Sequence, residues 1–432
     1  MDYILLLQEN IRCHQWSEYR ALEKTKEKRY LTKRKELTFI RHFIQPKKIL
    51  MPAHTISSSA FADTKPHYNI LNGLRGVAAL MVIWYHVFEA FATSPFDQNF
   101  NHGYLAVDFF FLLSGFVIGY AYDDRWGKMK TKDFFKRRLI RLHPMIIMGT
   151  VLGVMTFFLQ GSEKWDGTQV SVSMVMLAIL LHLFLIPASP GSGAEVRGNG
   201  EMYPLNGPAW SLFFEYIGNI LYALLLRRLP TRALMVFVGL AAAGLAIFAV
   251  GSFSGYGHLG VGWSLADNNF VGGLLRLLFS FSAGLLMSRL FKPVSIKGAF
   301  WICSVAIIVL LSMPYIGNSE TTWMNGLYDA VCTLIIFPIL IYLGASVKTT
   351  GKTTTRVCKF LGDISYPLYI VHYPFMYLFY SWIWKEGFTF SQTWHVALAL
   401  FFGNILLAWI CLKWYDEPLR KYLTKRFLLK KN

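Results

Sequence analysis

The chain has 432 residues, a formal net charge of +18, 54% hydrophobic residues and a mean hydropathy of +0.39. A hydropathy this high excludes an ordinary soluble or disordered protein and predicts an all-α integral membrane protein. The positive charge alone would suit a nucleic-acid-binding protein, but the basic residues are spread over short segments between apolar stretches. We therefore expect no nucleic-acid partner.

The first 69 residues differ in composition from the rest of the chain. The first fifty contain twelve basic and six acidic residues and show no signal-peptide pattern. We predict a basic cytoplasmic N-terminal extension over residues 1–69, with an amphipathic helix on the anionic inner leaflet. A natural start at Met51 is the alternative, because the first apolar stretch follows it directly.

Ten apolar stretches are long enough to cross a hydrocarbon layer about 30 Å thick. A shorter stretch at 172–187 is ambiguous by its length. The ten predicted spans are 71–91, 104–122, 139–160, 208–226, 233–250, 271–288, 299–316, 325–346, 364–384 and 394–412.

The basic residues predict the orientation of these spans. Five segments between the spans and at the C-terminal end contain 25 Lys and Arg residues in total. The opposite loops contain only three basic residues, Lys164, Arg197 and Lys385. By the positive-inside rule the five segments face the cytoplasm. A full crossing at 172–187 would put the later basic segments on the wrong side, so we interpret it as re-entrant or interfacial. This leaves about ten spans, with both termini cytoplasmic and a basic cytoplasmic tail at 423–432.

Arg75 and His86 lie eleven positions apart in the first span. Eleven steps of a helix end within about 20° of three full turns, so both side chains lie on one face, about 16 Å apart along the axis. Ionisable residues inside spans are candidates for a functional site. The structural alternatives are that Arg75 extends to the inner interface and that His86 is a hydrogen-bonded packing residue.

Two further groups of charged residues flank later spans. Arg138 and Arg141 are spaced i, i+3 at the entrance to the third span, where two guanidinium groups can project the same way and bind phosphate. Their alternative is an ordinary positive-inside anchor. Asp108 and Glu215 lie toward the start of the predicted spans 104–122 and 208–226, and either carboxylate could orient the imidazole of His86. Their alternative is a carboxylate favoured by the helix dipole.

The five cysteines show no spacing pattern, so we expect neither a disulfide framework nor a metal site.

The segment 72–79 together with His86 resembles the opening motif of the acyltransferase-3 family of membrane acyltransferases. Five further segments resemble later motifs of this family in the same order, and the resemblance covers roughly residues 68–422. It implies an acyltransferase membrane domain at 70–422, of the O-acetyltransferase type. Many relatives carry a fused esterase-like domain that is not found here, so we expect the membrane domain or a separate partner to complete the chemistry. The five further segments are 103–116, 137–144, 210–215, 361–374 and 416–418.

The resemblance also implies roles for individual residues. The catalytic group comprises His86, Asp108 and Glu215, and the donor-binding group comprises Arg75, Arg138, Arg141 and His372.

Three more residues receive secondary roles. Trp210 would form a wall for the acceptor, with an interfacial aromatic belt as its alternative. Ser114 is expected to be a small packing residue rather than a nucleophile. Glu417 is expected to clamp a cytosolic arginine. For His372, structural packing against Pro374 is an equal alternative.

The implied function is transfer of an acyl group, expected to be acetyl, from cytosolic acyl-coenzyme A to a hydroxyl of a carbohydrate or lipid-linked glycan at the outer side. Acyl-coenzyme A is a co-substrate, no cofactor is permanently bound, and the expected location is the bacterial inner membrane. Direct attack with His86 as general base and an acyl-histidine intermediate both remain open, as does the oligomeric state. The rival function is a secondary transporter exporting a small anionic or acylated metabolite, which predicts inverted halves with broken helices.

Overall fold

The computed structural model describes residues 68–294, 296–346 and 351–428. The chain divides into two units, Met1–Ala62 and Asp63–Asn432, and the described residues all belong to the second. The predicted N-terminal extension therefore lies almost entirely outside the described residues, as do residues 429–432 of the predicted tail. Within the described ranges the structure is helical, with two isolated β-bridges in the loops and no strand.

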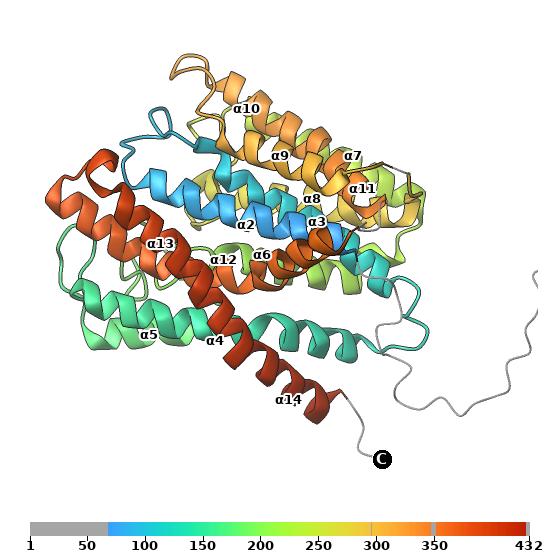
Figure 1. Ribbon diagram of the computed structural model, residues 1–432, viewed down its shortest axis with the longest axis horizontal. Helices are drawn as coiled ribbons and strands as arrows, with labels where there is room; N and C mark the ends of the chain where they lie inside the picture. The colour runs from blue at the N-terminus through green and yellow to red at the C-terminus, as the bar shows by residue number, and fades with distance from the viewer. Residues whose placement is uncertain (1–67, 295, 347–350, 429–432) are drawn as a thin grey trace, which may run out of the picture. The chain divides into compact units, whose positions relative to one another are not determined.

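The helices follow each predicted span and several extend beyond it. Figure 1 shows α2 through the middle of the second unit, with α9, α10 and α11 on one side and α4 and α5 on the other. Their bounds are α2 Asn69–Glu89, η2 Asn101–Leu105, α3 Ala106–Tyr122, α4 Thr131–Gln160, α5 Val172–Leu183, α6 Ala209–Leu224, η3 Leu226–Arg228, α7 Thr231–Val250, α8 Asp267–Leu290, α9 Ala299–Ser312, α10 Thr322–Val331, η4 Cys332–Ile336, α11 Phe337–Ser346, α12 Lys352–Glu386, α13 Phe390–Ile410, η5 Cys411–Asp416 and α14 Glu417–Phe427.

Among the described residues, eight helical segments are long and apolar enough to cross a membrane, which confirms the all-helical membrane class. Two apolar helices are shorter. The 12 residues of α5 rise about 18 Å and the 14 residues of α9 about 21 Å, both less than the thickness of the hydrocarbon layer. The helix α12 has 35 residues but is not among the eight. The count of ten spans and the cytoplasmic location of both termini remain predictions.

Small residues bring the central helices into close contact. A Cβ atom on Gly76 of α2 would lie 2.4 Å from the carbonyl oxygen of Leu361 on α12. A Cβ atom on Gly115 of α3 would lie 2.0 Å from the carbonyl oxygen of Phe281 on α8. Both distances exclude a side chain, so glycine permits each pair of helix backbones to approach, as is typical of membrane bundles.

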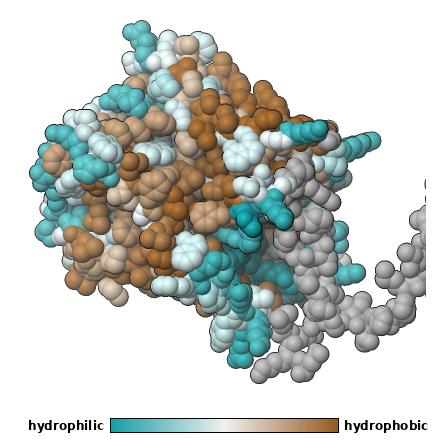
Figure 2. Space-filling view, in the orientation of Figure 1, coloured by the Kyte–Doolittle hydropathy of each residue, from teal (hydrophilic) through white to brown (hydrophobic). Residues whose placement is uncertain are grey.

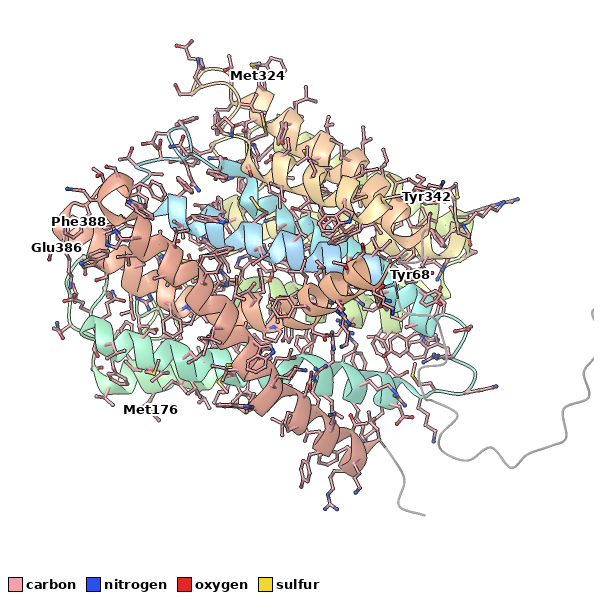
Figure 3. All side chains as sticks on the ribbon, viewed as in Figure 1. Tyr68, Met176, Met324, Tyr342, Glu386 and Phe388 are labelled. Carbon is pink, nitrogen blue, oxygen red and sulfur yellow. The ribbon has the colours of Figure 1, made fainter. Side chains whose placement is uncertain are left out.

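Apolar and aromatic side chains mark the surface of a membrane domain. Figure 2 shows apolar residues across the middle of the visible face and hydrophilic residues toward its ends. In Figure 3, Tyr68 and Tyr342 lie at one end of the helices, and Glu386 and Phe388 lie at the other. The Tyr68 ring packs edge-on against Phe116, and such aromatic residues near span ends are typical of a membrane interface.

Candidate active site

His86 lies in the last turn of α2, and its ring is held by a carboxylate. Nδ1 of His86 lies 2.7 Å from Oε2 of Glu89, one helical turn further along. The Tyr380 hydroxyl donates to the same carboxylate oxygen at 2.7 Å. Because a carboxylate and a tyrosine from α12 fix the Nδ1 side of the ring, Nε2 is the nitrogen that remains to exchange a proton with a substrate.

Glu89 was not among the residues predicted for the site. Asp108 or Glu215 was expected to orient the imidazole, and this expectation is wrong because both carboxylates pair with arginines elsewhere. The sequence did contain a pattern that points to Glu89, which lies three residues after His86. Residues spaced i, i+3 are neighbours on one face of a helix.

Asp108 forms a fully buried ion pair with Arg276 of α8. Nη2 of Arg276 lies 2.7 Å from Oδ2 of Asp108, and Nε lies 3.1 Å from both carboxylate oxygens. The guanidinium also donates to the carbonyl oxygens of Val261 and Tyr104. The carboxylate therefore neutralises a buried cation. An arginine inside an apolar stretch was the available sequence signal for Arg276.

Glu215 belongs to a group of charged residues around Arg138. Nη2 of Arg138 lies 2.6 Å from Oε1 of Glu215, and the Ser114 hydroxyl donates to this oxygen at 3.1 Å. The expected position of Glu215 beside His86 is therefore wrong. The packing residue of the second motif is Gly115, whereas Ser114 supports the carboxylate.

Arg75 is anchored to α12 about three helical turns from His86. Its Nε donates to the Ser365 hydroxyl at 2.8 Å, and its Nη2 donates to the Gly362 carbonyl at 2.9 Å. Both Arg141 and Glu215 act electrostatically on Arg75. Arg75 therefore belongs to one cluster with the arginines of segment 137–144.

Arg141 adds a cation to this cluster without direct neutralisation. In the part of the chain that the structure describes, Arg141 forms no ion pair, and Arg138, Arg420 and the Asp416 carboxylate lie within electrostatic range. We call Arg75, Arg138, Arg141 and Arg420 the arginine cluster. An unpaired guanidinium among other cations is suited to a phosphate-bearing ligand.

The acidic residues of segment 416–418 pair with other basic residues than expected. Glu417 lies 2.5 Å from Nζ of Lys413, one turn away, and Asp416 is the carboxylate that pairs with Arg420 at 2.8 Å. The expected clamp between Glu417 and an arginine is therefore wrong. The i, i+4 spacing explains both pairs.

His372 lies beside His86. The two ring centroids are 5.5 Å apart, and Nδ1 of His372 contacts the Leu368 carbonyl oxygen at 3.1 Å. Its Nε2 has no hydrogen-bond partner among the described residues, although the side chain is fully buried. This position favours a role near the reacting groups over one at the donor entrance.

A cavity of about 470 Å³ extends from His86 and Glu89 to the loops at the end of α2. Its wall is rich in aromatic side chains from several elements and includes Trp210, whose role as an acceptor wall stays a prediction. The aromatic lining residues are Tyr85, Tyr104, Trp165, Trp210, Tyr256, Trp263, Tyr369, Tyr373, Tyr377, Tyr380 and Trp384.

Glu89→Gln should lower kcat about 10- to 100-fold while the KM for acyl-coenzyme A stays near the wild-type value. The amide keeps the size of the side chain but removes the negative charge that stabilises an imidazolium at His86. Steady-state kinetics measure this. A matched control is Glu163→Gln, since Glu163 pairs with Lys385 away from His86. Equal kcat in both variants would contradict a positioning role for Glu89.

Glu201 in the loop between α5 and α6 is a second buried carboxylate of the cavity. It accepts hydrogen bonds from the Tyr377 hydroxyl and from Nδ2 of Asn199, the latter at 2.9 Å. Burial raises its pKa to about 7, although Tyr377 and Arg197 act in the opposite direction. Part of the population is therefore protonated near neutral pH.

This raised pKa predicts a pH dependence of stability. A carboxyl group with a raised folded-state pKa stabilises the fold at low pH, and this stabilisation is lost as pH rises from about 4.5 through about 7. The loss corresponds to about 3 kcal/mol. The melting temperature in detergent should fall between pH 5 and pH 8, and Glu201→Gln should flatten this decline. Parallel curves for the two proteins would show that Glu201 does not titrate in this range.

The site and fold together define a polytopic helical membrane protein with a histidine–carboxylate pair at the base of an aromatic cavity. A family model described as an acyltransferase domain matches residues 68–413, and the chain belongs to the acyltransferase-3 family. No solved structure matches the chain.

Several named proteins are similar to this chain. "Putative O-acetyltransferase SACOL0978" of Staphylococcus aureus is 26% identical over 81% of this chain, and the match spans 57% of that protein. Acyltransferase MdmB of Streptomyces mycarofaciens is 27% identical over 70% of this chain and 77% of its own length. "Protein 2 in picA locus" of Rhizobium radiobacter is 33% identical over 36% of this chain and 80% of its own length. The first two of these names describe acyltransferases, one of them a putative O-acetyltransferase.

Proposed function

We propose that this protein transfers an acetyl group from cytosolic acetyl-coenzyme A to a hydroxyl of a carbohydrate or lipid-linked glycan at the outer face of the bacterial inner membrane. The observation that carries the proposal is the arrangement along α2. His86 and Glu89 open into the aromatic cavity, and Arg75 lies in the arginine cluster about 16 Å away.

The arginine cluster supports the donor side of this proposal. Coenzyme A carries phosphates, which guanidinium groups bind through charge-assisted hydrogen bonds. The positive-inside rule predicts that Arg141 faces the cytosol, where coenzyme A thioesters are available. The thioester end of the donor would then extend from the cluster past Arg75 toward His86.

The His86–Glu89 pair supports the chemistry at the other end of this path. The acceptor hydroxyl would transfer its proton to Nε2 of His86 as its oxygen forms a bond with the thioester carbonyl carbon. The C–S bond then breaks, and coenzyme A leaves as the thiol after protonation. The Glu89 carboxylate stabilises the transient imidazolium, which favours direct transfer over an acyl-histidine intermediate.

The test compares membranes from cells with and without the protein by mass spectrometry of their glycans. The proposal predicts ester-linked acetyl groups that depend on this chain and on acetyl-coenzyme A. Identical glycans in both membranes, with no acetyl-coenzyme A consumed, would contradict the proposed function.

A further inference from the structure

The charged residues that line the cavity include two carboxylates, Glu89 and Glu201, that form no ion pair with a lysine or arginine among the described residues. Arg276 also lines the cavity, and its charge is neutralised by Asp108. The remaining titratable imidazoles are those of His86 and His258. The cavity wall described by the structure is therefore acidic.

The loops around the cavity also carry a net negative charge. The outer loops predicted from the sequence contain eight acidic residues against the three basic ones. Lys164, Arg197 and Lys385 do not line the cavity, and Lys385 pairs with Glu163. A negative potential in a cavity with low-dielectric walls repels anions and attracts cations.

Glu201 is placed to act on a ligand in this cavity. Arg197 acts electrostatically on Glu201 but does not line the cavity, and its guanidinium carbon lies 3.5 Å from the centroid of the Tyr377 ring. The Arg197 side chain donates to the Pro204 carbonyl and to Gln160. Glu201 is thus bound by Tyr377 and Asn199 without an ion pair of its own among the described residues.

We propose that this cavity selects acceptors without negative charge, namely neutral or amine-bearing polyhydroxylated molecules, and that Glu201 is a specificity-determining residue. The inference rests on the proposed function, because it concerns the acceptor of the same reaction. Aromatic walls pack against the apolar faces of sugar rings, whereas a uronate, sialate or phosphate would meet the Glu89 carboxylate and the ionised fraction of Glu201.

The first test measures the charge of the cavity without any turnover. A cysteine is introduced by Ala92→Cys in the cavity wall and, as reference, by Ser189→Cys on an exposed loop. Each is labelled at pH 8 with methanethiosulfonates carrying a trimethylammonium or a sulfonate group, and the parent protein serves as blank. The described native cysteines are buried. The cationic-to-anionic rate ratio should be about fivefold higher at Ala92→Cys than at Ser189→Cys.

Two further variants test whether Glu201 causes the higher rate ratio at Ala92→Cys. Adding Glu201→Gln to Ala92→Cys should lower the ratio toward the reference, whereas adding Glu163→Gln should leave it unchanged. Equal ratios at the cavity and the exposed loop, or no response to Glu201→Gln, would overturn the proposal. Preserved folding is checked by the melting profile of each variant.

The second test identifies the sugar residue that carries the acyl group. Fragmentation mass spectrometry of glycans should locate it on neutral or amino sugars in the wild type, and Glu201→Gln should add acylation of acidic sugars. Acyl groups on uronates or sialates in the wild type would overturn the selection. Absence of any acylation would instead contradict the proposed function, while the labelling ratios still decide the charge of the cavity.

Discussion

His86→Ala should reduce acyl transfer at least about 100-fold while insertion into the membrane stays intact. The substitution removes the imidazole that accepts the hydroxyl proton in the proposed reaction, and general-base catalysis contributes about 100- to 10,000-fold. An apolar residue in a span inserts at least as well as an imidazole. The measurement is acyl transfer per mole of protein in purified membranes.

The control for this prediction is His395→Ala, because His395 is an exposed histidine on α13 outside the cavity. That variant should retain wild-type transfer. Wild-type turnover by His86→Ala would refute the catalytic assignment, whatever role the residue has in packing.

Arg141→Ala should weaken binding of acyl-coenzyme A by roughly 10- to 150-fold, which corresponds to the loss of about 1.5–3 kcal/mol from one charge-assisted contact. Arg138→Ala should weaken binding similarly and also destabilise the protein, because it leaves the carboxylate of Glu215 without its partner. The effect should be larger for coenzyme A thioesters than for a truncated thioester without the nucleotide. Binding is measured by KM and by competition with free coenzyme A.

Arg232→Ala provides the matched control, since Arg232 is an exposed basic residue near the start of α7 and outside the arginine cluster. It should leave both donors unaffected. Equal losses for the full and truncated donors in Arg141→Ala would show that this residue is only a topological anchor.

Local patterns predicted the helices and part of the site. Apolar stretches gave the helices because backbone groups in a bilayer must pair within the chain. The helical period placed Arg75 and His86 on one face of α2, and both residues make the contacts to α12 that define the two ends of the site. Trp210 was expected at an acceptor wall and does line the cavity.

Pairings between distant helices could not be predicted in the same way. Several carboxylates and arginines were available, and sequence spacing does not determine which of them meet after the helices pack. The packing of α3 against α8 pairs Asp108 with Arg276, and that of α4 near α6 pairs Arg138 with Glu215. Glu89 was overlooked because it ends an apolar stretch, although its contact with His86 is local.

The most direct test of the proposed transfer uses sealed vesicles in which the cysteine of Ser189→Cys reports the orientation of each molecule. Acetyl-coenzyme A labelled in the acetyl group is supplied on one face and acceptor glycans on the other. We predict that free coenzyme A is released on the face bearing Arg141 and that labelled ester forms on the face bearing Glu201. Labelled ester confined to the Arg141 face would contradict transfer across the membrane, and transport of substrate without thioester cleavage would contradict acyl transfer itself.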